Sequence, residues 1–155
     1  MNNQRRKVLK TGSGAALLSV LAAAGIITPG MALADWNKAA FDAKSLSDTL
    51  KAIGAGAPAD SKDVQVTGPD IAENGAVVPV GVSTSLPNVQ MVAILIEKNP
   101  NPLAASFTLP EGTEANVQTR VKMGQTSNVY ALVKSDGKYF MATKEIKVTL
   151  GGCGG

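Results

Sequence analysis

Beyond Pro58 the chain consists of short apolar runs separated by turn residues, and this pattern limits the fold more than any other feature of the sequence. Short runs rich in β-branched side chains and bounded by Gly, Pro, Asn or Asp are typical of the strands of an all-β domain. We therefore expect about seven strands. The eight candidate runs cover residues 64–67, 77–82, 89–97, 105–109, 117–123, 128–134, 138–143 and 145–150.

These strands predict a mainly β fold, an Ig-like β-sandwich over residues 58–150. The run at 89–97 is the most apolar and should lie at the centre. Pro79 indicates an edge strand or a bulge, because proline lacks a backbone N–H. Hairpin signals occur at residues 73–75 (Glu-Asn-Gly) and, most strongly, at residues 136–137 (Asp-Gly). The absence of a Cys…Trp…Cys pattern excludes a disulfide-bearing antibody-type domain. The predicted core consists of Val66, Val80, Val82, Val92, Ile94, Ile96, Phe107, Val121, Val129, Ala131, Val133, Ile146 and Val148.

An amphipathic helix is predicted ahead of the strands, from Asp35 as N-cap to Ile53. Apolar residues recur there at steps of three and four and form one stripe, and Gly54 is placed to end the helix. We expect the stripe to pack on the chain's own domain, at one end of the sandwich or across one face. Docking to a partner is the alternative. Residues 35–57 are thus interpreted as a helix and a linker. The stripe consists of Trp36, Ala39, Ala43, Leu46, Leu50 and Ile53.

Residues 1–34 have the pattern of a removable export signal. A basic segment containing Arg5 and Arg6 precedes an apolar run, and the small-residue sequence at 32–34 precedes Asp35, which would begin the mature protein. The paired arginines predict the twin-arginine route and a periplasmic protein that folds before export. A membrane anchor is the alternative, although glycines and hydroxyl residues dilute the run. Export of a folded chain without evident cofactor ligands further predicts co-export with a partner that lacks its own signal.

The composition excludes several classes of function. The 155 residues include no histidine and one cysteine, which excludes histidine-dependent catalysis, histidine-ligated metal or haem, and an intramolecular disulfide framework. Four of the 15 basic residues lie in the first ten positions, so the mature chain would keep 11 against 12 acidic residues. A nearly neutral chain with 4% aromatic residues does not favour nucleic acid or an anionic membrane as a partner. We expect no cofactor and no metal.

The single cysteine, Cys153, lies in the terminal sequence Gly-Gly-Cys-Gly-Gly. Because glycine has no side chain, this segment is expected to be a thin, flexible arm that carries Cys153 about 10 Å beyond Leu150. A solvated thiol titrates near ~8.5, and the arm contains no base. Cys153 is therefore interpreted as a covalent attachment point whose chemistry other proteins supply. A frayed terminus, an incidental thiol or an intermolecular disulfide is the alternative. The glycines of the arm are Gly151, Gly152, Gly154 and Gly155.

The terminal Gly-Gly-Cys-Gly-Gly, behind an Ig-like domain and a twin-arginine leader, resembles the SoxY family. SoxY is the sulfur-carrier subunit of the periplasmic thiosulfate-oxidising system. The resemblance spans the chain in architecture, and its sharp motif is residues 151–155. It implies a non-catalytic carrier that presents thiosulfate-derived intermediates on Cys153, with the flanking glycines as the slender arm.

The resemblance also implies a set of partners. SoxAX, which contains haem, would join thiosulfate to Cys153, and the metal-dependent SoxB would hydrolyse the bound sulfonate. A sulfur dehydrogenase, where present, would oxidise the remaining sulfur. The carrier would work as a complex with SoxZ, a small β-sandwich without a leader, which agrees with the co-export prediction.

Two other functions stay open on the residues alone. A periplasmic structural or adaptor domain would use Cys153 for a disulfide between subunits. An enzyme would require a carboxylate pair, and the sequence distinguishes no such pair among its 12 acidic residues.

Overall fold

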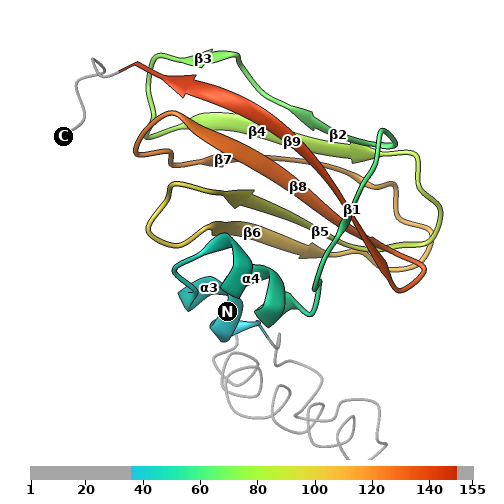
Figure 1. The fold of residues 1–155 in the computed structure, drawn as a ribbon. Coiled ribbons are helices and arrows are strands. Elements are labelled where there is room, and N and C mark those ends of the chain that lie inside the picture. Colours follow the sequence, from blue (N-terminus) through green and yellow to red (C-terminus); the bar gives the residue numbers. More distant parts are fainter. Residues whose placement is uncertain (1–35, 150–155) are drawn as a thin grey trace, which may run out of the picture. The chain divides into compact units, whose positions relative to one another are not determined.

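The computed structural model describes residues 36–149, and Asn37–Thr149 belong to one compact unit (Figure 1). The fold is mainly β, as the sequence predicted. Within the described range, no helix is long and apolar enough to cross a membrane. The predictions for the leader (1–34) and for the arm (151–155) lie outside the described residues. The predicted N-cap at Asp35 is wrong, because the first described helix begins at Lys38 and its N-cap is Asn37.

The strands form two sheets. The larger sheet has the order β1-β9-β8-β5-β6, with the short β3 also paired to β9, and the smaller sheet has the order β2-β4-β7. Both β1 and β3 run parallel to β9, whereas the other pairs are antiparallel. The strands are β1 (Ala59–Asp60), β2 (Val64–Thr67), β3 (Ile71–Ala72), β4 (Val78–Thr84), β5 (Val89–Ile96), β6 (Leu103–Thr108), β7 (Asn116–Val121), β8 (Ser127–Ser135) and β9 (Lys138–Val148).

One hydrophobic cluster joins the two sheets. Strand side chains alternate between faces, so each sheet contributes every second residue to it. Ile94 and Val92 from β5 and Val80 and Val82 from β4 are buried in this cluster. Every residue predicted for the core belongs to it, although Val66, Phe107 and Val148 are only partly buried.

The single helix predicted from Asp35 to Ile53 is wrong in its continuity. Two helices occupy this segment, α3 (Lys38–Asp42) and α4 (Leu46–Ile53). The second helix begins after Ser45, which is its N-cap, because the Ser45 hydroxyl accepts a hydrogen bond from the Asp48 N–H. The apolar stripe did not reveal this break, because the periodicity of apolar residues continues across it. The predicted end of the helix is confirmed, since Gly54 is the C-cap with φ +81°.

The helices pack on the outer face of the larger sheet. The predicted stripe packs there only in part, because Leu46, Leu50 and Ile53 belong to this cluster, whereas Trp36 and Ala39 are exposed. Leu50 of α4 lies in one cluster with Leu95 of β5 and Leu132 of β8. Because β5 and β8 are covered on both faces, their long apolar runs need no polar alternation. The sequence-based core omitted this second cluster, which contains Ala40, Leu50, Ala55, Ala93, Leu95, Leu103 and Leu132.

Three features of the strands differ from the predictions. The two C-terminal runs are one strand, β9. Residues 73–75 do not close a tight hairpin, because β3, which precedes them, pairs with β9 rather than with β4. Pro79 lies in the central strand of the smaller sheet rather than at an edge. It is tolerated there because β2 ends at Thr67, before it reaches Pro79. The Asp136-Gly137 turn is confirmed, with φ +48° and +74°.

Truncation of neighbouring core residues tests the two-sided burial of β5. Ile94 contacts the cluster between the sheets and Leu95 contacts the helical layer, and both are fully buried. We expect Ile94→Ala and Leu95→Ala each to lower the free energy of unfolding by about 2–5 kcal/mol, measured by urea denaturation. A loss below about 1 kcal/mol for Leu95→Ala would show that the helical layer does not stabilise the sheet.

Candidate functional site

The predicted site residues Gly151, Gly152, Cys153, Gly154 and Gly155 lie outside the described residues. The structure describes the point from which this segment leaves the folded unit. We call Val148 and Thr149 the arm root. Strand β9 reaches the root from the interior of the larger sheet, between β8 on one side and the short β1 and β3 on the other (Figure 1).

Backbone hydrogen bonds hold the arm root on both sides. The Thr149 N–H donates to the Ala72 carbonyl at 3.1 Å, so the root is tied to β3. On the opposite side the Val148 N–H donates to the Thr126 hydroxyl oxygen at 3.0 Å. One residue earlier, the Lys147 N–H donates to the Asp70 carbonyl at 3.0 Å. The last described residues are therefore fixed to the sheet edge and to the loop before β8.

The β3–β4 loop and the β7–β8 loop approach each other closely beside the arm root. The Met123 N–H donates to the Gly75 carbonyl at 2.7 Å, and the Met123 side chain is only 2% exposed. A Cβ on Gly75 would lie 2.4 Å from the Met123 carbonyl oxygen and 2.9 Å from the Val148 Cγ1. Gly75 is therefore required by close packing beside the root rather than by an unusual backbone conformation. Asn99 ties the same loop to the β5–β6 connection, because its amide donates to the Lys122 carbonyl at 2.7 Å.

The charges near the arm root balance. Lys144 lies 2.8 Å from the Asp70 carboxylate. The hydrogen bond from Lys144, and then its charge, hold the pKa of Asp70 below its ordinary value of 3.8. Glu73 and Lys147, which are exposed and of opposite charge, lie in the same region. These two acidic and two basic side chains therefore cancel in sign.

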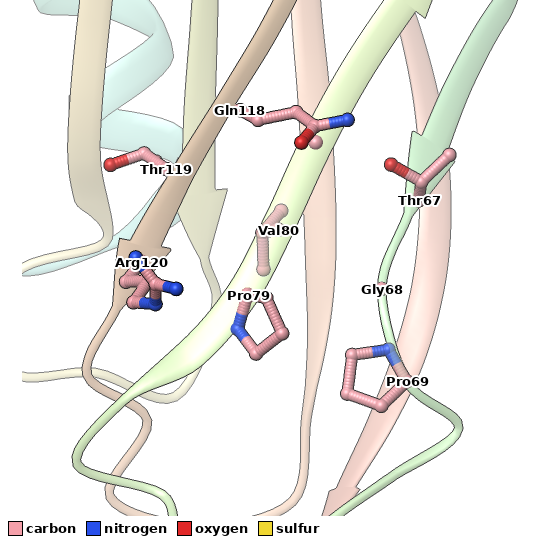
Figure 2. Close-up of a pocket in the computed structure, with 9 residues that line it drawn as sticks. Thr67, Gly68, Pro69, Pro79, Val80, Gln118, Thr119 and Arg120 are labelled. Carbon is pink, nitrogen blue, oxygen red and sulfur yellow. The ribbon is translucent and has the colours of Figure 1, made fainter.

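Two surface hollows are lined by residues of the strands and their connecting loops. The first, of about 430 Å³, lies on the outer face of the smaller sheet between the end of β2 and the end of β7. Figure 2 shows Gln118 and Arg120 of β7 beside Pro79 of β4, with Thr67 and Pro69 on the far side. Its lining offers one cation and several hydrogen-bonding groups, but none of its residues is a thiol or a carboxylate.

The second hollow, of about 860 Å³, lies between the β4–β5 and β6–β7 loops. It is at the end of the sheets opposite to the arm root, because β4 starts beside the root and ends at this hollow. Its ionisable residues are Glu111 and Glu114, which are both exposed.

Across residues 36–149 no group of three or more metal-ligating side chains is found. Burial, and then the charge of Glu97, raise the pKa of the Tyr130 phenol above its ordinary value of 10.0.

Comparison with known proteins supplies the family. The profile of the family described as "Sulfur oxidation protein SoxY" matches residues 50–153, a range that includes the arm root and extends to Cys153. The chain belongs to the SoxY family. The match leaves out α3 and the first half of α4, so the family profile covers the two sheets and only part of the helical layer.

A solved structure agrees with this assignment. The chain is similar to the sulfur carrier protein SoxY from Chlorobium limicola f thiosulfatophilum, with 36% identity and a TM-score of 0.59 over 66% of this chain and 96% of that chain. Chains from two further structures match at TM-scores of 0.39 and 0.37, with 9% and 12% identity, and carry no argument. They come from work on toxic shock syndrome toxin-1 and on the human ZAG–PIP complex, and they cover 56% and 57% of this chain and 99% and 95% of their own. No curated protein sequence matches the chain significantly.

Sequence reasoning singled out Cys153 as the candidate attachment point, which stays a prediction, and it missed the contacts that hold the arm root. The two-residue strand β3 and the contact between Gly75 and Val148 join segments that lie more than 70 residues apart. Glu73-Asn74-Gly75 was the available signal, but it was interpreted as a hairpin. Its glycine is needed because Val148 and the Met123 carbonyl leave no room for a side chain.

Substitution of Gly75 tests the packing of the arm root. We expect Gly75→Ala to lower the free energy of unfolding by about 1–3 kcal/mol, because the new Cβ would overlap the Met123 carbonyl and Val148. Gly124→Ala is the matched control, since a Cβ there would meet nothing within 4 Å. Denaturant unfolding measures both, and equal stability of the two variants would contradict the close approach.

The Asp70–Lys144 pair predicts a pH effect with a defined sign. Because the folded state lowers the pKa of Asp70, its stabilisation is present above the unfolded pKa and is lost as the pH falls through the folded pKa. In an NMR titration, Lys144→Met should raise the Asp70 midpoint toward its ordinary value. Lys147→Met should raise it less, because Lys147 acts only through a weaker charge interaction. Equal effects of the two variants would argue against the Lys144 hydrogen bond as the main cause.

Proposed function

We propose that this chain is a non-catalytic sulfur carrier, an Ig-like β-sandwich that presents thiosulfate-derived intermediates on Cys153 to the enzymes of thiosulfate oxidation. The observation that carries the proposal is the family match, which runs through Gly151 and Gly152 to Cys153. The related structure is titled a sulfur carrier protein. A fixed arm root beside a glycine-flanked cysteine is consistent with this role, because it gives the terminal segment a defined starting point.

The carrier chemistry balances when partner enzymes supply an oxidant and water. A bond between the Cys153 sulfur and the outer sulfur of thiosulfate forms with loss of two electrons, which the haem-containing SoxAX accepts. Hydrolysis by SoxB then adds water, releases sulfate and one proton, and leaves a neutral persulfide on Cys153. A sulfur dehydrogenase would take six electrons from the persulfide, add three waters and form a second sulfonate. Hydrolysis of that sulfonate would restore the thiol.

The residues around Cys153 in the sequence indicate which steps the partner enzymes would have to perform. A solvated thiol has a pKa near ~8.5, so most of it is protonated at neutral pH unless a base lies close by. The chain has no histidine, and no lysine or arginine follows Lys147. Glycines on both sides of Cys153 keep the polypeptide narrow, which suits entry into an enzyme's active-site channel. Activation of the thiol would therefore take place inside the enzyme that receives it.

Export and partnership belong to the same proposal. Residues 1–34 would direct a folded protein to the periplasm through the twin-arginine route, and cleavage would leave Asp35 as the first residue. SoxZ, which has no leader, would be exported bound to this chain. SoxAX, SoxB and the dehydrogenase would then dock transiently.

Replacement of the cysteine tests the function directly. We expect Cys153→Ser to abolish thiosulfate-dependent turnover in a reconstituted Sox system, because the oxygen cannot form the sulfur–sulfur bond. Folding should not change, and the unfolding midpoint of the variant serves as the control. Intact mass of the native protein after incubation with thiosulfate and SoxAX should increase by sulfur adducts that reductant removes.

Two outcomes would contradict the carrier. Normal turnover by the serine variant would exclude Cys153 as the attachment point. A protein that works only as a stable cross-linked dimer on a non-reducing gel would instead support the adaptor domain with a disulfide tether.

A further inference from the structure

Two exposed apolar side chains, Ile71 and Val77, lie in the short segments next to the arm root. Within residues 36–149, the large hydrophobic side chains with half or more of their surface exposed are Trp36, Ile71 and Val77, and the last two are 56% and 50% exposed. A single exposed hydrophobic residue is ordinary on a soluble protein. For Ile71 and Val77, the position beside the arm root, rather than the exposure alone, therefore points to a function.

Ile71 and Val77 belong to the two short segments that hold the root. Ile71 is the first residue of β3 and lies opposite Lys147, and its neighbour Ala72 accepts the hydrogen bond from Thr149. Val77 closes the turn that contains Gly75, because its N–H donates to the Asn74 carbonyl at 3.3 Å. Gly75 in turn lies against Val148.

The pair brackets the root at one end of the molecule. Ala72 and Val78, which follow them in sequence, are buried in the core between the sheets, whereas Ile71 and Val77 face solvent. Ile71 is carried by the larger sheet and Val77 leads into the smaller one. Figure 1 shows β3 and the start of β4 at the same end as the end of β9.

The chain length between the root and the cysteine limits how far an enzyme can stay from this end. Cys153 is four residues beyond Thr149, which allows at most about 14 Å between their Cα atoms even for an extended chain. An enzyme that takes the sulfur into its active site must therefore bring the mouth of its channel to within that distance of Thr149. Such a mouth covers the surface next to the root.

We propose that Ile71 and Val77 form a docking surface for the channel mouth of the enzyme that acts on Cys153, and that the facing rim of that enzyme is apolar. The inference rests on the proposed carrier function. The local charges favour apolar contact over electrostatic attraction, because Asp70 is paired with Lys144 and the exposed Glu73 and Lys147 are opposite in sign. A contact of two side chains buries little area and is therefore weak, which suits a complex that must dissociate after every reaction step.

The test compares hydrolysis of the S-sulfonated protein by SoxB in the native chain and in Ile71→Lys/Val77→Lys. We expect the double variant to raise KM about tenfold with little change in kcat, because the channel mouth would have to accept two charges in place of apolar contacts. Thr113→Lys/Gln65→Lys is the matched control, since it adds the same charge at exposed positions away from the root. It should keep the native KM. Unfolding stability and the rate of Cys153 alkylation by iodoacetamide should be equal in all three proteins.

A free peptide provides a second measurement. S-sulfonated Leu-Gly-Gly-Cys-Gly-Gly carries the substrate group without the docking surface, so its kcat/KM should be at least about tenfold lower than that of the native protein. The lysine double variant should fall toward the value of the peptide. Conservative exchange, Ile71→Val/Val77→Ile, should keep native kinetics.

An unchanged KM in the lysine double variant, or equal kcat/KM for peptide and protein, would overturn the docking surface and leave the carrier function standing. Failure of the carrier function has a different signature. In that case SoxB would not hydrolyse the S-sulfonated native protein at all, or Cys153→Ser would turn over thiosulfate normally, and the docking surface would be overturned with it.

Discussion

The burial of β5 and β8 on both faces is the constraint on which the rest of the structure depends. One face of this strand pair meets the smaller sheet and the other meets α4. Because neither face is solvated, the register of the larger sheet is strongly fixed, and a shift by one residue would exchange two apolar sets of different shape. Strand β9 pairs with β8 along its length and inherits that fixed position.

The position of β9 determines where the terminal segment leaves the fold. A C-terminal strand at a sheet edge would be free to fray, whereas the last residues of β9 pair with β3 on one side and are held on the other by the hydrogen bond from the Val148 N–H to the Thr126 hydroxyl. β3 provides the second neighbour with only two residues, Ile71 and Ala72. The small strand therefore has a structural effect out of proportion to its length, because it ties the arm root to the folded unit.

The pairing of an anchored root with a glycine-flanked cysteine separates two physical requirements. The folded unit supplies stability and a fixed surface through buried apolar contacts and backbone hydrogen bonds. Four glycines around Cys153 contribute no side-chain bulk that an active-site channel would have to accommodate. In the proposed carrier, the folded unit would provide stability and a fixed surface, and Cys153 would provide the reactive thiol.

The sequence by itself determined the mainly β class, the core between the sheets, the Asp136-Gly137 turn and Cys153 as the candidate site. These follow from local rules, namely side-chain alternation, the backbone freedom of glycine, and the chemistry of one residue type. Only the tertiary structure decided the break before α4, the second core cluster, the place of Pro79 in a central strand, and the pairing of β3 with β9. Each of these depends on contacts between segments distant in sequence, which periodicity and turn signals do not encode.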